Sequence, residues 1–139
     1  MKFRGKYEFL SNMFNCGVEW KGEVYRCSET VFQMEKCERE EDKKRFKGLM
    51  PGQAKKLGRR IKMRSDWNDI KLQIMKELLR KKFNREPFKQ QLIDTGDEEL
   101  VEGNRWGDTY WGVCRGRGQN KLGKLLMQVR KEINDDSCE

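Results

Sequence analysis

The feature that most constrains the fold is one long amphipathic segment in the middle of the chain. Between Asp66 and Pro87 the apolar residues recur every three or four positions, which is the period of a helix that buries one face. Asp66 is a suitable N-cap, and Pro87 ends the helical pattern. The apolar stripe consists of Trp67, Ile70, Ile74, Met75, Leu78, Leu79 and Phe83. We therefore predict that this helix forms the centre of the core.

Shorter elements are predicted around this helix. A glycine between two aromatic and β-branched stretches predicts a β-hairpin over residues 18–25, and residues 100–102 predict a brief strand. Further helices are predicted over residues 28–37 with Ser28 as N-cap, over 51–61, over 87–96, and along the stripe Leu122, Leu125, Leu126, Val129 and Ile133. The predicted fold class is α+β, a predominantly helical single domain with a small β-sheet or hairpin.

The 139 residues have the size of one domain. We predict a single domain over residues 1–131, followed by an acidic tail over residues 132–139 that frays because it lacks an apolar period. No apolar run approaches the roughly 18 residues of a membrane span, and residues 1–10 lack the apolar block of a signal peptide. The expected location is cytoplasmic, without membrane contact.

The chain contains no histidine, and this absence narrows the possible chemistry. Ser-His and Cys-His nucleophile pairs are excluded, together with most zinc enzymes. The five cysteines form no C-x-x-C pair, so we predict free thiols and neither a disulfide framework nor a zinc site. Any general acid or base must be Glu, Asp, Lys, Tyr or Cys. We expect no metal and no cofactor.

Positive charge is concentrated in one part of the chain. The net charge is +8 (31 basic minus 23 acidic residues), and residues 43–64 contain ten basic side chains and no acidic one. The helix predicted there carries Lys55, Lys56, Arg59 and Arg60 on its polar side. Such a run is either a solvated helix face or a surface that docks on nucleic-acid phosphates. These four residues are the candidates for nucleic-acid docking.

A first polar cluster lies on the helix predicted over residues 28–37. Glu29, Gln33 and Lys36 stand at i, i+4 and i+7, so their side chains share one face. A solvated helix face has the same spacing, but Val31 and Phe32 bring apolar surface that can desolvate the amine.

A second cluster is the glycine-rich loop between residues 102 and 123. It combines Glu102 and Asp108 with Trp111 and with flexible glycines that precede a helix. Backbone N–H groups and the helix N-terminus could hold a phosphate there, although glycine-rich loops are more often only turns.

These segments together resemble the NADAR superfamily, also called YbiA-like, from about Tyr7 to Arg130. The matching blocks are FLSNMF (residues 9–14), SETVFQMEK (28–36), PGQAKKLGR (51–59), RSDW (64–67), KF (82–83), Glu102, DTYWG (108–112) and NKLGKLLMQVR (120–130). Single blocks are weak signals, but their ordered combination is specific. The sequence departs from the family pattern at Met13, Cys114 and Arg115.

The resemblance implies an N-glycosidase fold that acts on ribose-linked bases. Members are associated with removing ADP-ribose from guanine bases of nucleic acid, sometimes as antitoxins to a cognate ADP-ribosyltransferase toxin, and with hydrolysing riboflavin-biosynthesis intermediates. The family's polar positions carry over to Glu29, Gln33, Lys36, Glu102, Asp108 and Asn120. The candidate substrate-binding residues in these blocks also include Asn12, Phe14, Ser28, Trp67, Trp111 and Gly112.

Cleavage of a ribosyl C–N bond builds positive charge on the sugar and requires a proton on the leaving nitrogen. Glu29 and Asp108 can divide those two roles directly. Alternatively, a neutral Lys36 amine attacks the opened sugar aldehyde and forms a Schiff base that water resolves, which requires a lowered pKa of Lys36. Phe14 and Trp111 can stack on a base.

The alternative to an enzyme is a module that binds nucleic acid or ADP-ribose without catalysis. The basic run over residues 43–64 supports this alternative. A pure binder would retain DNA without releasing a sugar product. The sequence leaves open whether the substrate is a base in DNA or RNA, a free nucleotide, or a riboflavin intermediate.

Overall fold

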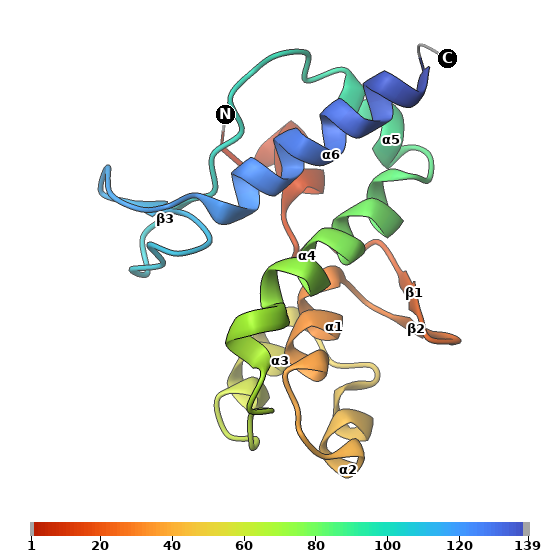
Figure 1. The fold of residues 1–139 in the computed structure, drawn as a ribbon, viewed down its shortest axis with the longest axis vertical. Coiled ribbons are helices and arrows are strands. Elements are labelled where there is room, and N and C mark those ends of the chain that lie inside the picture. The colour runs from red at the N-terminus through yellow and green to blue at the C-terminus, as the bar shows by residue number, and fades with distance from the viewer. Residues whose placement is uncertain (1, 138–139) are drawn as a thin grey trace. The chain divides into compact units, whose positions relative to one another are not determined.

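The structure is a computed structural model that describes residues 2–137, which fall into two compact units. The hairpin unit comprises residues 12–78, and the loop unit comprises residues 2–11 together with residues 79–137. Helices dominate, and the strands are short (Figure 1). The predicted α+β fold class is confirmed. Among residues 2–137 no helix is long and apolar enough to cross a bilayer.

The elements in chain order are the 3-10 helix η1 (Gly5–Leu10), β1 (Val18–Trp20), β2 (Glu23–Tyr25), α1 (Ser28–Glu35), α2 (Glu40–Lys43), the 3-10 helix η2 (Lys44–Phe46), α3 (Pro51–Gly58), α4 (Trp67–Phe83), α5 (Phe88–Ile93), β3 (Gly103–Asn104), β4 (Val113–Cys114) and α6 (Lys121–Ser137).

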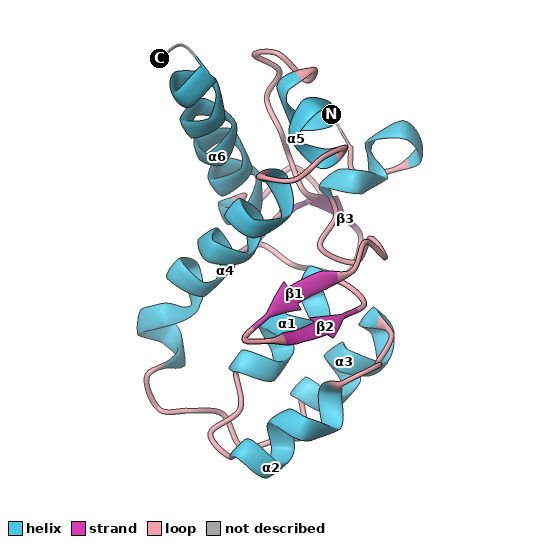
Figure 2. Cartoon of the chain, turned by 90° about the vertical axis from the view of Figure 1, so that its right-hand side faces the viewer, coloured by secondary structure: helices cyan, strands magenta, loops and turns pink. Residues whose placement is uncertain are grey.

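The predicted β-hairpin is confirmed. β1 and β2 pair antiparallel, with Val18 opposite Tyr25. The two turn residues both have positive φ, 49° for Lys21 and 84° for Gly22, which gives the backbone twist that a two-residue hairpin requires. Trp20 Nε1 donates to the Glu35 carboxylate at 2.9 Å, so the hairpin is attached to α1, beside which it lies in Figure 2.

Helix α1 begins at Ser28, one residue earlier than a Ser28 N-cap would place it. The N-cap is Cys27, and no side chain caps the helix. The predicted capping role of Ser28 is wrong because the chain supplies a distant acceptor instead. The Glu29 N–H donates to the Asn12 carbonyl at 2.9 Å, and Ser28 itself is buried.

Helix α3 begins at Pro51 as predicted, and the Gln53 side chain accepts a hydrogen bond from the Met50 N–H at 2.9 Å. Figure 1 shows α1 and α3 packed against each other. Gly58 permits this contact, because a Cβ built at that position would lie 2.1 Å from Gln33 Oε1. Ala54 is fully buried on the same side of α3.

The long central helix predicted over residues 67–83 is confirmed as α4. The N–H groups of Asp69 and Ile70 donate to the Asp66 carbonyl, while the Asp66 carboxylate accepts hydrogen bonds from Arg64. Five residues of the predicted stripe are buried and two, Ile70 and Ile74, are half-buried. The buried residues are Trp67, Met75, Leu78, Leu79 and Phe83.

The loop unit buries a lysine at the end of α4. Lys82 is 2% exposed, and its Nζ donates to the Ser11 carbonyl at 3.0 Å. The ammonium also lies 5.1 Å and 5.8 Å from the ring centres of Phe83 and Phe88. Burial of a charge is costly unless polar or aromatic partners compensate, so this contact holds residues 2–11 onto α4.

The strand predicted over residues 100–102 is placed too early in the chain. The strand is β3 at Gly103–Asn104, which pairs in parallel with β4. The preceding residues are held by a side chain instead. Asn120 Nδ2 donates to the Leu100 carbonyl at 2.9 Å, and Asn120 Oδ1 accepts the Glu102 N–H at 3.0 Å.

The sequence predicts that residues 132–139 fray. This prediction is wrong for residues 132–137, which are helical, because α6 ends at Ser137. Glu132 accepts two hydrogen bonds from Arg80, at 2.9 Å and 3.0 Å, and Ile133 is buried. The ion pair with Arg80, which lies more than 50 positions earlier, attaches this part of α6 to α4. Cys138 and Glu139 lie outside the described residues.

Candidate active site

The predicted site residues form two groups, one in each unit. The hairpin unit contains Asn12, Phe14, Ser28, Glu29, Gln33, Lys36 and Trp67, together with the basic helix α3. The loop unit contains Glu102, Asp108, Trp111, Gly112 and Asn120.

Glu29 is a buried carboxylate, with 8% of its surface exposed. It lies in the first turn of α1, where the helix macrodipole favours a negative charge. Its Oε1 accepts a hydrogen bond from Gln33 Nε2 at 2.8 Å. Because Gln33 is in turn pressed against Gly58, the amide is held in place from both sides. This face of α1 is therefore not a solvated helix surface.

Lys36 follows α1 as its C-cap residue and is half-buried. Its carbonyl accepts the Arg64 N–H at 3.0 Å, and the next residue forms an antiparallel bridge with Met63. These backbone contacts fix the position from which the amine projects.

The pKa of Lys36 is lowered, chiefly because burial disfavours the charged ammonium. Cys37 and Glu29 act in the opposite direction and raise the pKa, while the positive charge of Arg59 lowers it further. A nucleophilic amine requires such a shift, and both burial and a neighbouring cation contribute to it. Burial raises the pKa of the neighbouring Cys37 to about 11, so that thiol stays protonated near neutral pH and is a poor nucleophile.

Three buried polar atoms of the hairpin unit have no hydrogen-bond partner among residues 2–137. They are Asn12 Oδ1, Ser28 Oγ and Gln33 Oε1. All three residues belong to the predicted site, and the Asn12 amide nitrogen already donates to Met75 Sδ at 3.2 Å. An unsatisfied buried polar atom costs free energy, which a sugar hydroxyl or an ordered water would recover.

The aromatic residues of this group are packed rather than free. The Trp67 ring lies 4.9 Å from the Phe32 ring at an interplanar angle of 53°, and both side chains are buried. Phe14 is half-buried. Trp67 thus supports the α1 face by packing, and its predicted contact with substrate stays a prediction.

In the loop unit, Asp108 organises a turn. Its Oδ1 accepts the N–H groups of Tyr110 at 3.1 Å and of Trp111 at 2.9 Å. Asn104 holds the same turn, because its Oδ1 accepts the Asp108 N–H and its Nδ2 donates to the Asp108 carbonyl. The Trp111 and Tyr110 rings meet edge to face at 4.9 Å.

Gly112 and Asn120 connect this turn to α6. The Gly112 carbonyl accepts the Asn120 N–H, and a Cβ at Gly112 would lie 2.1 Å from the Glu102 carbonyl oxygen. The Asn120 amide is engaged with backbone groups through both its nitrogen and its oxygen, so its side chain positions the loop. Its predicted role in substrate binding would require these bonds to be exchanged.

The N-terminus of α6 is also occupied, contrary to the expected phosphate site. The N–H groups of Lys121 and Leu122 donate to the carbonyls of Tyr110 and Trp111 at 3.1 Å and 3.0 Å. Loop carbonyls therefore satisfy donors that an anion would otherwise use.

The comparisons with known proteins show the family and the fold. The profile of the NADAR domain matches residues 2–134. The chain belongs to the NADAR family. The E. coli N-glycosidase YbiA is 33% identical over 132 residues, which cover 91% of this chain and 82% of YbiA. The NMR structure of E. coli YbiA superposes with a TM-score of 0.89 at 29% identity, over 100% of this chain and 87% of YbiA.

Two other relatives match this NADAR domain over a smaller share of their own length. A riboflavin biosynthesis protein of Vibrio vulnificus is 34% identical over 132 residues, covering 91% of this chain but 36% of that protein. An N-glycosidase of Nostoc punctiforme is 44% identical over 89 residues, covering 61% of this chain and 56% of that enzyme. The chain thus spans about a third of the Vibrio protein and just over half of the Nostoc enzyme.

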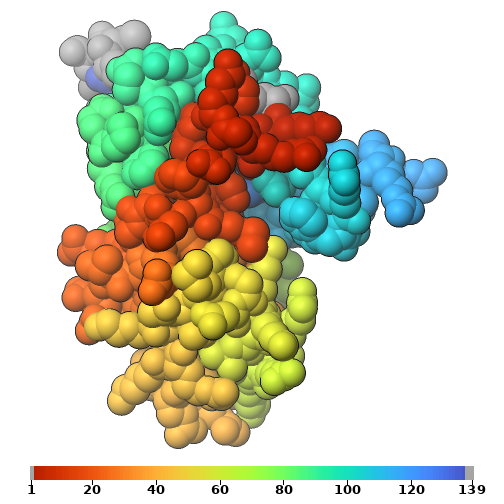
Figure 3. Space-filling view, turned by 180° about the vertical axis from the view of Figure 1, so that it is seen from behind, coloured from red at the N-terminus to blue at the C-terminus, as the bar shows by residue number. Residues whose placement is uncertain are grey.

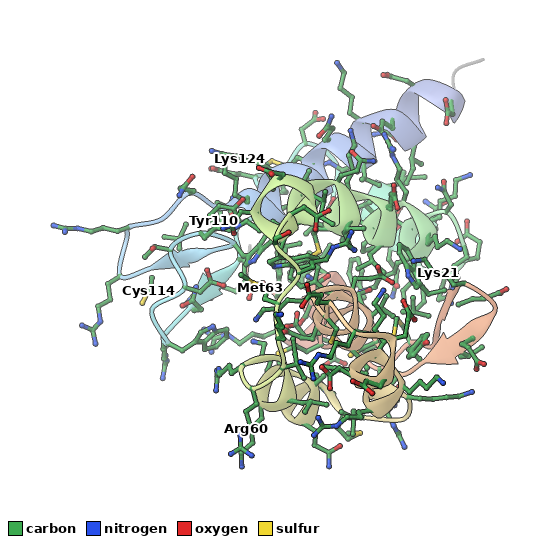
Figure 4. The ribbon with its side chains drawn as sticks, turned by 60° about the horizontal axis from the view of Figure 1, so that its bottom comes forward. Lys21, Arg60, Met63, Tyr110, Cys114 and Lys124 are labelled. Carbon is green, nitrogen blue, oxygen red and sulfur yellow. The ribbon has the colours of Figure 1, made fainter. Side chains whose placement is uncertain are left out.

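Half of the basic side chains in the run over residues 43–64 form ion pairs with acids that lie outside the run. Five of its cations form ion pairs: Lys43 with Glu40, Arg45 with Asp42, Lys47 with Glu23, Lys62 with Glu38, and Arg64 with Asp66. Lys56, Arg59 and Arg60 form no ion pair with the described residues and are exposed. Figure 4 shows the Arg60 side chain pointing away from the ribbon. Lys55 is half-buried.

The four cysteines within residues 2–137 are free thiols. Over the same residues no group of three or more Cys, Asp or Glu side chains is arranged to hold a metal ion.

Sequence reasoning missed two residues that shape the site of this NADAR domain. Gly58 lies within the matching block over residues 51–59 and receives no role from the sequence, although it is what admits the Gln33 amide. Asn104 was given no role, although it holds the Asp108 turn. An asparagine after a glycine and four residues before an aspartate is a recognisable turn signal, and it could have identified Asn104.

Proposed function

We propose that this NADAR domain is an N-glycosidase that removes ADP-ribose from guanine bases of nucleic acid. The observation that carries the proposal is the half-buried Lys36 amine, with its lowered pKa, on the same face of α1 as the buried Glu29–Gln33 pair. A lowered pKa increases the fraction of neutral, nucleophilic amine, whereas a solvated lysine is almost entirely protonated near neutral pH. The N-glycosidase names of YbiA and of the Nostoc enzyme support the reaction class.

In the proposed reaction, the ribose ring first opens so that C1 carries a double bond to the base nitrogen. The neutral Lys36 amine adds to C1, the bond between C1 and the base nitrogen breaks, and that nitrogen leaves with a proton. Water then adds to the Schiff base, the C1–Nζ bond breaks, and the sugar aldehyde closes again to a ring. The net reaction consumes one water molecule and returns the amine.

We assign the proton transfers of this sequence to Glu29. The carboxylate is buried, so it is shielded from bulk water, and Gln33 fixes one of its oxygens. The same carboxylate can stabilise positive charge that develops on the sugar.

Nucleic acid is favoured as the carrier of the modified base by the unpaired cations of α3 and the turn after it. Lys56 and Arg60 are exposed and form no ion pair among the described residues, so they remain available for phosphates. The second candidate substrate is a riboflavin-biosynthesis intermediate, which is favoured by the name of the Vibrio relative.

Product identification would test the proposal. The protein is incubated separately with a guanine-ADP-ribosylated oligonucleotide and with a ribosylated riboflavin intermediate, and the products are identified by mass spectrometry. We expect free ADP-ribose and an intact oligonucleotide from the first substrate. Release of ribose phosphate from the second substrate alone would favour the riboflavin candidate, and retention of DNA without any sugar product would indicate a binding module.

The charge of Arg59 is expected to tune the reaction through Lys36. Because Arg59 lowers the pKa of Lys36, the Arg59→Gln variant should have a higher Lys36 pKa and less neutral amine at pH 7. Turnover of the wild type should rise with pH as Lys36 loses its proton, and the variant should follow the same rise at higher pH. The readout is kcat/KM between about pH 6 and 10 on a short substrate. Arg60→Gln is the matched control, because it removes the neighbouring positive charge. It should leave the pH dependence of kcat/KM unchanged.

Lys56 and Arg60 are expected to dock long nucleic acid without taking part in the chemistry. The double variant Lys56→Gln/Arg60→Gln should lose activity on a long substrate, and its log–log salt slope should flatten by about 0.9 for each duplex phosphate that is no longer neutralised. A modified mononucleotide should be cleaved at the wild-type rate. Lys43→Gln/Arg45→Gln removes two cations that already pair with acids and should change the slope less. Equal losses on both substrates would contradict a docking role.

A further inference from the structure

A cluster of arginines lies at the tip of the loop unit, outside the groups described above. β3 and β4 pair in parallel with Asn104 opposite Cys114, so the chain leaves both strands at the same edge. Arg105 and Arg115 are the next residues, so each directly follows a member of the last paired step. Arg117 returns to the same place, because its N–H and carbonyl both bond to Cys114, at 3.1 Å and 2.8 Å. Figure 3 shows the cyan and light-blue segments next to each other.

An exposed aromatic ring adjoins these arginines. Trp106 directly follows Arg105, and 64% of its surface is exposed. Tyr110 and Trp111 in the same loop are half-buried and pack against each other. A tryptophan with this exposure adds little to the core, and tryptophan is enriched at interaction surfaces because its ring combines a large apolar face with a polar N–H group.

The charge of this loop is positive. Residues 103–121 contain four basic side chains and one acidic one, Asp108, which gives 4 − 1 = +3. The Asp108 Oδ1 is already bonded to the turn. Arg105, Arg115 and Arg117 are exposed and form no ion pair with residues 2–137. Their charges therefore remain available to an anionic partner.

The backbone presents Arg115 at a position where arginine is uncommon. Its φ of 52° lies in the left-handed region, and the following Gly116 has φ of 77°, so the two residues form the tip of a tight turn. Asparagine or glycine adopts this conformation more readily.

We propose that Trp106, Arg105, Arg115 and Arg117 form a binding site for single-stranded nucleic acid. The indole stacks on an unpaired base, and the guanidinium groups contact the flanking phosphates. A single strand is the fitting partner because a base inside a duplex has both faces covered by its neighbours. The proposal goes beyond the glycosidase reaction, since it requires neither ADP-ribose nor Lys36.

Fluorescence anisotropy with unmodified oligonucleotides tests this site. The full chain is titrated into a labelled oligo-dT of about 20 nucleotides, long enough to cover a typical single-strand site, and into a duplex of the same length. Trp106→Ala should weaken binding of the single strand about 5- to 100-fold, and Trp106→Phe should retain most of it. Duplex binding should change little in either variant. Unchanged urea midpoints would show that the variants remain folded.

The arginines are tested by charge removal with a matched control. Arg115→Gln/Arg117→Gln should weaken single-strand binding and reduce its log–log salt slope by about 1.4, or about 0.7 for each phosphate contact. Lys124→Gln/Lys131→Gln removes the same charge from the exposed side of α6 and should have a much smaller effect. The proposal is overturned if Trp106→Ala binds oligo-dT as tightly as the wild type. It is equally overturned if the two double variants lose the same affinity, because binding would then follow net charge alone.

Discussion

Replacing Lys36 by arginine is expected to abolish turnover, by about 10⁴-fold or more, as the loss of a covalent nucleophile does elsewhere. Arginine keeps the positive charge and much of the length, but its guanidinium stays protonated and cannot form an imine. Substrate should still bind, because Glu29, Gln33 and the polar atoms around them are unchanged. Lys62→Arg alters an exposed lysine and should leave the rate unaffected.

Chemical trapping distinguishes a nucleophile from a binding group. Borohydride added during turnover by the wild type should reduce the Schiff base and leave a sugar adduct on Lys36, which peptide mass spectrometry can locate. The Lys36→Arg variant should bind substrate by anisotropy and carry no adduct. Near-normal turnover of that variant, or reduction that traps nothing on this residue, would show that Lys36 acts electrostatically and that the direct carboxylate mechanism applies.

Replacing Gly123 by alanine is expected to destabilise the protein by about 3 kcal/mol, near the upper end of what overpacking costs. Alanine usually stabilises a helix relative to glycine by up to about 1 kcal/mol. We therefore expect the change in stability at Gly123 to have the opposite sign from the usual one. The reason is steric: a Cβ at Gly123 would lie 2.0 Å from the Leu100 carbonyl oxygen and 2.4 Å from Asn120 Nδ2. These groups hold the segment before β3 to α6, so they cannot move apart cheaply.

Urea unfolding followed by circular dichroism gives the free energy of unfolding for this test. Gly52→Ala in α3 is the matched control, because a Cβ there meets nothing within 4 Å. That control should be neutral or slightly stabilising. A Gly123→Ala protein as stable as the wild type would mean that the loop can shift away from α6 at little cost, contrary to the rigid attachment inferred from Asn120.

Local sequence signals located the elements but not their ends. The apolar periods identified α3, α4 and α6, and a glycine between two strand-like stretches identified the hairpin, because these patterns follow from backbone geometry within a few residues. The start of α1 is held by the Asn12 carbonyl, and Glu132 of α6 is held by Arg80. Both partners are distant in sequence, so no local pattern contains them.

The sequence by itself determined which side chains share the proposed catalytic face: Glu29, Gln33 and Lys36 are aligned by the helical repeat alone. Tertiary structure decided their state. The packing of α3 on α1 at Gly58 fixes Gln33, and burial and Arg59 lower the pKa of Lys36. Two cations of the basic run, Lys47 and Lys62, pair with acids more than 20 positions earlier in the sequence. The physical reason is that a repeat is a property of a few consecutive residues. Burial and charge pairing depend instead on which distant residues the folded chain brings within a few ångströms.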